Sequence, residues 1–564
     1  MSTDYDCDFI VIGSGFGGSV SALRLSEKGY SVAVLEMGKR FSGRDFAKTN
    51  WNLRKYLWVP QLMLHGIQQI TLLKNVLIFH GAGVGGGSLV YANTLLVPPE
   101  EVFRDPRWPS NEDWETKLAP HYQTARFMLG AVEAPELFPA DTLLKDVVED
   151  MTGQEVPLHR HTVGVYFGET DRRVDDPFFG GEGPARTGCN LCGECMTGCK
   201  NDAKNTLDKN YLHLAEQRGC VIHPETRVTD VRPLAEGGYL IQTERSTALF
   251  AKRPKVYRAR GVVFSASVLG TVKLLFQCKE RGSLPELSDQ LGSYVRTNSE
   301  AILAARTRDT EVDYSHGIAI TSGIHPDEKT HVEIVRYGKG QDFMATMMTL
   351  LTGGGEPWPR WLRWLGNMAR HPIRFLRATL PCGWARHTAM VLMMQPVDNY
   401  MKLRMRNKLW RRTLDSELEE GQSVPTYTPL ANDLTTRLAK KMNGTPQSLI
   451  LEVLADASST AHILGGATMA RSPVEGVCDA RGRVFGYEDM YVADGSIVPA
   501  NLGVNPSLTI TALSEYVMSG IPDKPGAETR PAPRAAAPVR RDQGNQGPFP
   551  GAPGRYWGGD ERGH

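Results

Sequence analysis

The stretch from Cys189 to Cys199 carries a pattern of residues that could bind metal. Four of the 9 cysteines of the chain fall within it, at the spacing CxxCxxCxxxC. This spacing is typical of bacterial iron–sulfur sites, whereas zinc sites usually consist of two separated CxxC pairs. Lys200 stands where ferredoxins usually have proline. The pattern favours an iron–sulfur cluster on Cys189, Cys192, Cys195 and Cys199, with zinc or four reduced structural thiols as alternatives.

A second chemical pattern lies at the start of the chain. The segment from Asp8 reads as strand, glycine-rich turn, amphipathic helix and second strand, in the sequence DFIVIGSGFGGSVSALRLSEKGYSVAVLEMG. Gly13, Gly15 and Gly18 form GxGxxG, which permits a tight turn, a close approach of pyrophosphate and close packing of the helix. Glu36 ends the second strand, where a carboxylate can bind a ribose hydroxyl. The segment predicts a dinucleotide site without distinguishing FAD from NAD.

Two further segments suit a flat or charged ligand. The first runs from His80 to Leu95, HGAGVGGGSLVYANTL, and its glycines leave main-chain N–H groups accessible. The second starts at Tyr491 and reads YVADGSIVPANLGVNPSLTITALSEYV. It predicts a strand ending at Asp494, a loop, and a helix from near Pro506. The N-terminus of such a helix favours negative charge. The predicted cofactor-binding residues are Gly13, Gly15, Gly18, Glu36, Gly83, Gly85, Gly86, Gly87, Ser88, Asn93, Asp494, Gly495, Asn505 and Pro506.

These three segments together resemble the glucose–methanol–choline (GMC) oxidoreductases, which bind FAD. Within that family the sequence is most similar to bacterial cholesterol oxidases that hold FAD without a covalent bond. NTLDKNYLHLAEQRGC from Asn205, GVVFSASVLGTVKLLF from Gly261 and HILGGATM from His462 extend the resemblance to about Pro522. Relatives with covalent FAD attach it through a residue such as histidine near the glycine-rich loop, and SLVYANT contains none. The resemblance therefore implies non-covalent FAD.

The resemblance also implies a pair of catalytic residues. Alcohol oxidation in the family removes a hydroxyl proton while a hydride leaves the same carbon for the flavin. His462 matches the family's histidine, and Asn505 matches its partner asparagine. Histidine suits the role because its ordinary pKa is about 6.5, and asparagine offers both a donor and an acceptor. The alternative for His462 is a buried histidine without a catalytic role.

Glu333, in THVEIVRYGKG, resembles a third residue of the family. In steroid-converting members a glutamate moves a proton and shifts a double bond into conjugation with the new ketone. That role would suit a carboxyl whose pKa is raised toward neutrality by an apolar pocket. The alternative is an exposed glutamate on a strand of alternating polarity.

The order of the predicted elements indicates an α/β fold, α+β overall. Strand–turn–helix units near both ends and in the middle predict a Rossmann-like FAD-binding domain assembled from residues 1–95, 200–300 and 465–522. Residues 96–199, which include the cysteines, and 301–464 would form a substrate-binding domain with an antiparallel sheet and helices. The active site is expected at the interface between these domains.

Composition excludes several classes of partner and location. The 564 residues carry a net charge of +1, so no nucleic acid partner is expected. The N-terminus lacks a signal-peptide pattern, which predicts a cytoplasmic protein, and no apolar run is long enough for a membrane span. In a reducing cytoplasm clustered cysteines favour metal ligation. Residues 523–564 are rich in proline, glycine, alanine and arginine, which predicts a disordered tail.

One segment suggests peripheral membrane contact. In the helix predicted after Pro357, one face carries large apolar residues and the other is basic. Such a helix can lie on an anionic membrane, although an apolar face packed on the core is the more common arrangement. The apolar face comprises Trp361, Trp364, Leu365 and Met368, and the polar face comprises Arg360, Arg363, Asn367 and Arg370.

The leading functional prediction is FAD-dependent oxidation of the 3β-hydroxyl of a cholesterol-type sterol to the ketone. Oxygen would be the acceptor and give hydrogen peroxide, and Glu333 would be the candidate for Δ5 to Δ4 isomerisation. A first alternative is an FAD dehydrogenase for a sterol or other hydrophobic alcohol that passes electrons to an iron–sulfur cluster or an acceptor protein. A second is a non-catalytic flavin- or lipid-binding protein.

Overall fold

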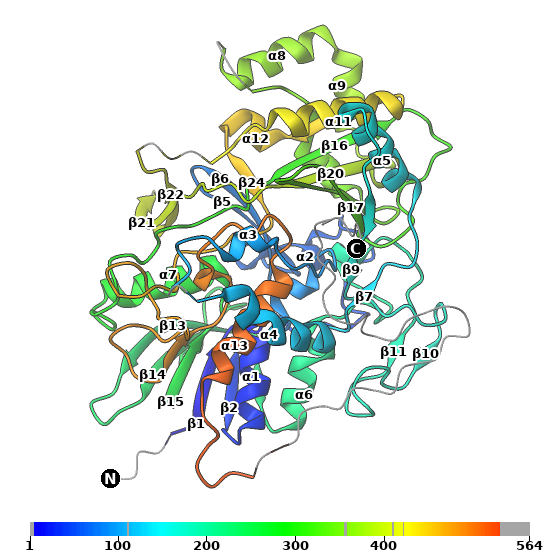
Figure 1. Ribbon diagram of the computed structural model, residues 1–564. Coiled ribbons are helices and arrows are strands. Elements are labelled where there is room, and N and C mark those ends of the chain that lie inside the picture. Colours follow the sequence, from blue (N-terminus) through cyan, green and yellow to red (C-terminus); the bar gives the residue numbers. More distant parts are fainter. Residues whose placement is uncertain are drawn as a thin grey trace, which may run out of the picture.

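The computed structural model describes residues 5–109, 112–354, 358–408, 411–420, 422, 424–528 and 530. Two seven-stranded sheets dominate the fold (Figure 1). The first has the order β12-β2-β1-β15-β14-β13, with β25 paired to β15. Its strands are β1 (Cys7–Ile12), β2 (Val32–Leu35), β12 (Val221–His223), β13 (Thr226–Pro233), β14 (Tyr239–Arg245), β15 (Lys255–Phe264) and β25 (Met490–Val492).

The first sheet has a parallel part and an antiparallel part. β1 pairs in parallel with β2 and β15, whereas β13, β14 and β15 pair antiparallel. The side chains of Phe9, Ile10 and Val11 are at most 2% exposed, so β1 is covered on both faces, as expected for a parallel strand. The α/β class with a Rossmann-like unit is confirmed. All seven strands lie in the segments predicted for the FAD-binding domain, whose boundaries stay a prediction.

Helix α1 (Phe16–Glu27) follows β1 and packs beside α6 (Tyr211–Gln217) and α13 (Ser507–Ser519) (Figure 1). The contact with β1 needs a glycine, because a Cβ on Gly18 would lie 2.0 Å from the carbonyl oxygen of Gly13. Close packing of helix on strand is the role that the GxGxxG pattern predicts for Gly18. The N-terminus of α1 is thereby fixed at the end of β1.

The second large sheet is antiparallel, with the order β19-β23-β16-β20-β18-β17-β8. Helices α5 (Pro139–Thr152) and α11 (Pro429–Lys441) pack on it and on each other. Val332 and Ile334 belong to the core beneath these helices, so Glu333 between them faces the other way. The strands are β8 (Leu158–Arg160), β16 (Ala301–Thr307), β17 (Ile320–Asp327), β18 (Thr330–Val335), β19 (Met348–Leu350), β20 (Thr388–Met394) and β23 (Gly444–Leu449).

A small sheet of β5 (Gln68–Leu72), β6 (Val76–Gly81) and β24 (Ser458–Thr460) connects two segments of the candidate site. β24 pairs in parallel with β6, so the two strands end at the same edge. β6 leads into the glycine-rich loop, and β24 leads to His462. Parallel pairing thus brings together two segments that are far apart in the sequence.

The remaining elements are short or peripheral. The helices are α2 (Leu53–Tyr56), α3 (Glu100–Phe103), α4 (Trp114–Met128), α7 (Ser267–Glu280), α8 (Arg360–Arg370), α9 (Pro372–Thr379), α10 (Trp384–His387) and α12 (Ile450–Ala455). The strands are β3 (Trp58–Val59), β4 (Leu64–His65), β7 (Val132–Glu133), β9 (Thr162–Val163), β10 (Arg173–Val174), β11 (Arg186–Thr187), β21 (Lys402–Lys408) and β22 (Arg411–Glu417).

The structure corrects the predicted start of the disordered C-terminal tail. The Lys524 ammonium lies 2.6 Å from Asp8 Oδ2, and the backbone N–H of Lys524 donates to the carbonyl of Lys28, so the chain still packs on the first sheet beyond residue 523. Residues 529 and 531–564 lie outside the described residues.

No helix in the described ranges is long and apolar enough to cross a bilayer. The predicted cytoplasmic location stays a prediction.

Candidate active site

The N-terminal glycine loop leaves open space at the start of α1. Gly15 is the N-cap of this helix, and a Cβ placed there would have no neighbour within 4 Å. Gly13 adopts φ 99°, where a Cβ would lie 2.4 Å from the carbonyl oxygen of Ser265. The backbone N–H groups at a helix N-terminus favour a bound phosphate. The loop therefore has the shape that a dinucleotide pyrophosphate requires.

Glu36 lies at the end of β2, beside this loop, and is 5% exposed. Its Oε2 accepts from the backbone N–H and the hydroxyl of Ser14, at 3.0 and 2.7 Å, and its Oε1 accepts from Gly38 N–H at 2.7 Å. Burial raises the pKa of Glu36, although these hydrogen bonds oppose the shift. Its place beside the phosphate loop fits the predicted ribose contact, which stays a prediction.

The second glycine-rich loop packs directly on the first. A Cβ on Gly86 would lie 2.6 Å from Gly15 Cα, and Gly85 N–H donates to Ser14 Oγ at 3.1 Å. Ser88 is buried, its hydroxyl donates to the Gly85 carbonyl at 2.7 Å and accepts from Leu207 N–H at 3.0 Å, so its contacts hold the loop and join it to the segment before α6. Asn93 is buried next to the Cys195 thiol, but neither of its amide atoms has a partner that meets hydrogen-bond geometry. Such a buried amide fits a polar contact with a ligand.

The third segment ends at the N-terminus of α13. Asp494 is buried and its carboxylate accepts from Ser496 N–H at 2.8 Å and from the Thr271 hydroxyl at 2.6 Å, so it fixes the turn that begins at Gly495. Pro506 directly precedes α13. The helix therefore begins where the sequence predicts. A direct contact of Asp494 or Gly495 with the cofactor stays a prediction.

The catalytic candidate His462 is held by a carboxylate that sequence reasoning missed. Its Nδ1 lies 2.6 Å from Glu300 Oε1, and the side chains are 14% and 0% exposed. Glu300 Oε2 also accepts from Ala461 N–H at 2.9 Å, which fixes the histidine's own loop. Burial lowers the pKa of His462, but the charge and hydrogen bond of Glu300, with the charge of Glu333, together outweigh it, so the pKa is raised overall. No motif marks Glu300, which directly precedes β16.

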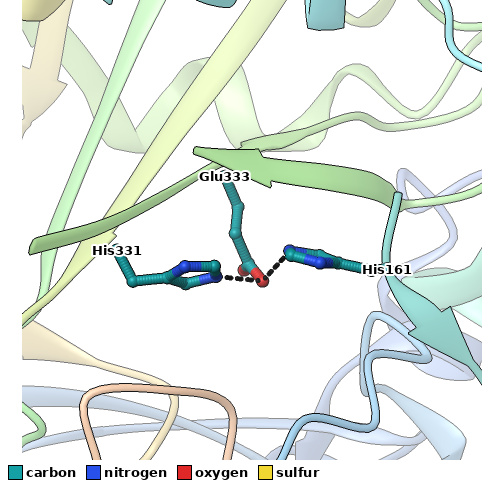
Figure 2. A group of neighbouring side chains, drawn as sticks. All are labelled: His161, His331 and Glu333. Atoms are coloured by element: carbon teal, nitrogen blue, oxygen red, sulfur yellow. Dashed lines mark hydrogen bonds and ion pairs between the residues drawn. The ribbon is translucent and has the colours of Figure 1, made fainter. Parts of the chain in front are cut away.

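Glu333 and Asn505 lie together, as Asn505 Nδ2 donates to Glu333 Oε2 at 3.2 Å. Two histidines contact the other carboxylate oxygen, His161 Nε2 at 3.0 Å and His331 Nε2 at 3.1 Å (Figure 2). Burial would raise the pKa of Glu333, but the bonds and charges of both histidines outweigh it and lower the pKa. The predicted apolar pocket that raises this pKa is therefore wrong, as is the alternative of an exposed glutamate. Asn505 Oδ1 is buried without a partner.

The histidine contacts continue from this carboxylate toward the surface. His331 Nδ1 lies 3.2 Å from His325 Nε2, and His325 Nδ1 lies 3.1 Å from the Thr330 carbonyl oxygen. The ring of His159, an exposed residue, lies 6.5 Å from that of His325. His331 and Glu333 share one face of β18 because they are two residues apart, and that spacing is a signal the sequence analysis did not use.

The comparisons with known proteins agree with this architecture. The GMC oxidoreductase family pattern matches residues 403–514, and the pattern for an NAD(P)-binding Rossmann-like domain matches residues 11–69. Over 92% of this chain and 95% of the relative, the sequence is 47% identical to a cholesterol oxidase of Acinetobacter baumannii. It is 46% identical to a cholesterol oxidase of Mycobacterium tuberculosis, over 96% and 95%. The chain belongs to the GMC oxidoreductase family.

More distant GMC relatives share less. A long-chain-alcohol oxidase of Arabidopsis thaliana is 22% identical over 92% of this chain and 68% of the relative. The crystal structure of pyridoxine 4-oxidase from Mesorbium loti superposes with a TM-score of 0.57 at 13% identity, over 91% of this chain and 99% of that chain. That similarity shows the GMC fold alone. GMC oxidoreductases use FAD, and the open space at Gly15 fits such a cofactor.

Proposed function

We propose that this GMC oxidoreductase oxidises the 3β-hydroxyl of a cholesterol-type sterol to the ketone, with non-covalent FAD and with oxygen as the acceptor that becomes hydrogen peroxide. The observation that carries the proposal is the pair of buried side-chain groups His462–Glu300 and Asn505–Glu333. Each pair contains one of the two residues that the family resemblance marks as catalytic. The two cholesterol oxidases with 46% and 47% identity support the substrate class.

The geometry supports one direction of proton transfer at His462. Because Nδ1 faces the Glu300 carboxylate at 2.6 Å, this nitrogen carries the hydrogen and Nε2 is left as the acceptor. His462 Nε2 accepts the hydroxyl proton of the substrate, and Glu300 stabilises the imidazolium that forms. Asn505 donates to Glu333, and its unpaired Oδ1 is left to accept from a donor other than this hydroxyl, whose single hydrogen goes to His462. FAD, when bound, takes up the two electrons released from the alcohol carbon.

The chain's three glycine and loop segments would hold FAD. The backbone from Gly13 to Gly18 would bind the pyrophosphate, and Glu36 the ribose. The loop Gly83–Ser88, with Asn93, would approach the flavin ring, and the turn at Gly495 and the N-terminus of α13 would close the site. SLVYANT, which follows the glycines, contains no histidine for covalent attachment, so we propose that FAD is released intact by denaturation.

The test measures three quantities during aerobic turnover with cholesterol. Equal amounts of ketone formed, oxygen consumed and peroxide released are expected. If turnover needs an artificial electron acceptor, oxygen is rejected as the acceptor. If no sterol of a panel bleaches the flavin anaerobically, the substrate class is rejected. Flavin that stays with the denatured chain would reject non-covalent binding.

Glu333 is proposed to shift the double bond of the ketone. Its carboxylate is ionised, because His161 and His331 lower its pKa, so its oxygens carry no proton and can accept one from the steroid, while the same shift makes it a weaker base. Glu333→Gln should keep oxidation of the alcohol within about tenfold but remove isomerisation by a factor of about 100 or more. The ultraviolet absorbance of the conjugated ketone, compared with peroxide released, measures this ratio. An unchanged ratio in Glu333→Gln would reject the role.

A second candidate function replaces oxygen by another acceptor. It is favoured by one observation, that the Lys204 ammonium contacts both the glycine-rich loop and the cysteine segment. In this case the protein would be a dehydrogenase that passes electrons to a cluster on those cysteines. Low oxygen consumption together with fast reduction of a one-electron dye would favour this candidate, and rapid peroxide release would reject it.

A membrane surface is proposed as the source of the sterol. Helices α8 and α9 form the outermost layer next to α11 and α12 (Figure 1). They expose apolar residues between arginines and contain no acidic residue. The predicted polar face is wrong at Arg360, which is 5% exposed and pairs with Glu452 at 2.8 Å, thereby anchoring α8. The exposed apolar residues are Trp361, Leu365, Ile373 and Leu376, and the exposed arginines are Arg370, Arg374 and Arg377.

A further inference from the structure

The four cysteines of CxxCxxCxxxC lie in a packed segment between β11 and α6. Cys189, Cys195 and Cys199 pack against a small apolar core, and Cys192 is exposed at the rim. Two backbone groups point at sulfur: Leu191 N–H donates to Cys189 Sγ and Lys204 N–H donates to Cys199 Sγ, each at 3.4 Å. Hydrogen bonds from backbone N–H groups to cysteine sulfur are among the interactions that tune iron–sulfur clusters.

The separation of the sulfur atoms does not match a single metal ion held by three or more of them. In the described part of the chain, the only three metal-binding side chains whose ligand atoms lie within 4.8 Å of one another are His161, His331 and Glu333. No three of the cysteine sulfurs therefore lie that close. Thiolates at about 2.3 Å from one zinc ion would be only about 3.8 Å apart. In a cubane cluster each cysteine binds its own iron, so wider separations are expected.

Two buried cations flank the cysteines without a matching carboxylate. Lys204 and Arg186 are each 1% exposed, and neither has a carboxylate within ion-pair distance among the described residues. Arg186 donates instead to the carbonyls of Asp202, Ala203 and Lys204, which end the cysteine segment. The charged forms of these two side chains are costly to bury without a counter-charge. A cluster held by four thiolates has a net negative charge and supplies the missing counter-charge.

The cysteine segment also lies against the proposed flavin loop. The Lys204 ammonium donates to the carbonyl of Cys195 at 2.7 Å and to that of Leu89 at 3.2 Å. Leu89 ends the turn Gly86–Leu89 of the glycine-rich loop. The Tyr91 hydroxyl, from the same loop, donates to the carbonyl of Asn205 at 3.0 Å. One ammonium group therefore bridges the loop of one candidate cofactor and the backbone of the other.

We propose that Cys189, Cys192, Cys195 and Cys199 ligate one [4Fe–4S] cluster next to the glycine-rich loop. Lys204 and Arg186 compensate its negative charge, and Leu191 and Lys204 donate backbone hydrogen bonds to its thiolates. The site goes beyond the proposed sterol oxidation and does not depend on it. Its contents can be counted in protein that does not turn over.

The test uses the full chain purified without oxygen. About four iron atoms and four acid-labile sulfides per chain are expected, with an electron paramagnetic resonance signal after reduction by dithionite. One zinc per chain without sulfide would overturn the proposal, and so would a chain that still takes up no iron and sulfide after anaerobic reconstitution. These counts do not involve substrate, so they stay informative if sterol oxidation fails.

Variants separate ligation from folding. Cys195→Ser should lose most of the iron and sulfide, whereas Cys382→Ser, at an exposed cysteine of the segment between α9 and α10, should keep both. The melting temperature and the bound FAD of each variant serve as folding controls. If Cys195→Ser folds, binds FAD and keeps its iron, the assigned ligand set is wrong. If Cys195→Ser does not fold, the iron content of Cys192→Ser, at the exposed rim, decides in the same way.

Discussion

At the scale of single residues, the candidate site consists of contacts between buried carboxylates and histidines. Glu300 holds His462 from one side, whereas His161 and His331 hold Glu333. The two carboxylates have different effects, because Glu300 raises the pKa of His462 while the two histidines lower the pKa of Glu333. One buried carboxylate thus makes a stronger base of its partner, and the other is kept ionised.

Removing the charge of Glu300 should change both the rate and its pH dependence. In the proposed mechanism His462 must be neutral to accept a proton, so kcat/KM rises as the pH passes the raised pKa of His462. Glu300→Gln lowers that pKa, so the rising limb should move to lower pH, and kcat should fall about 10²–10⁴-fold. The pH profile of peroxide release, or of dye reduction, measures both the rate and the position of the rising limb. Glu311→Gln, at an exposed site, is the matched control, and a profile in Glu300→Gln that equals wild type would reject the role.

At the scale of elements, the site depends on how closely α1 approaches its neighbours. A Cβ on Gly17 would lie 1.5 Å from the carbonyl oxygen of Ala493, in the turn that precedes Gly495. A Cβ on Gly15 would meet nothing within 4 Å. Adjacent parts of one loop therefore have different tasks: Gly17 permits packing inside the protein, and Gly15 keeps space for a ligand.

Two alanine substitutions should separate these tasks. Gly17→Ala should destabilise the fold by about 1–3 kcal/mol, because the new methyl group overlaps backbone that cannot move away. Gly15→Ala should leave the melting temperature of the apoprotein unchanged and reduce the amount of bound FAD. Thermal unfolding and the flavin absorbance of the purified chains measure the two effects. Equal melting temperatures for the two apoproteins would contradict this division.

Helices α8 and α9 should bind anionic membranes through their exposed faces. Trp361 and Leu376 are 44% and 57% exposed, so Trp361→Ala with Leu376→Asp should weaken binding to vesicles of anionic lipid about tenfold or more. Vesicle sedimentation at low and high salt measures the binding. Phe250→Ala is the control, since this residue is 95% exposed on a loop far along the chain. Equal loss of binding in the control and the double variant would reject the surface.

At the scale of the whole molecule, local patterns were predictable and long-range contacts were not. GxGxxG with Glu36 could be placed from the sequence because a strand, a turn and a helix follow one another within about thirty residues. Glu300 could not, because its partner Thr460 is 160 residues away and a backbone bridge between Arg296 and Leu464 brings that loop near. The predicted environment of Glu333 was wrong for the same reason, since His161 comes from a different segment of the chain.

The distribution of the cofactor site over the chain should make FAD a strong stabiliser. The proposed contacts join the N-terminal loop, the glycine-rich loop and the segment at Gly495, so bound FAD would link parts of the chain that separate on unfolding. A ligand at 100 times its dissociation constant stabilises by about 2.7 kcal/mol. Removal of FAD should therefore lower the melting temperature, and its return should restore it. A melting temperature that is the same with and without FAD would contradict this expectation.

The row of histidines behind Glu333 has a consequence for the number of protons that the folded chain holds. The contacts from Glu333 through His331 and His325 end at the Thr330 carbonyl, so an acceptor stands at each end. Three hydrogen bonds need three hydrogens, and two neutral imidazoles carry only two. Because burial lowers the pKa of both His331 and His325, the row holds two hydrogens for three contacts, and one contact is left open to a proton that arrives from the surface, without any change in the fold.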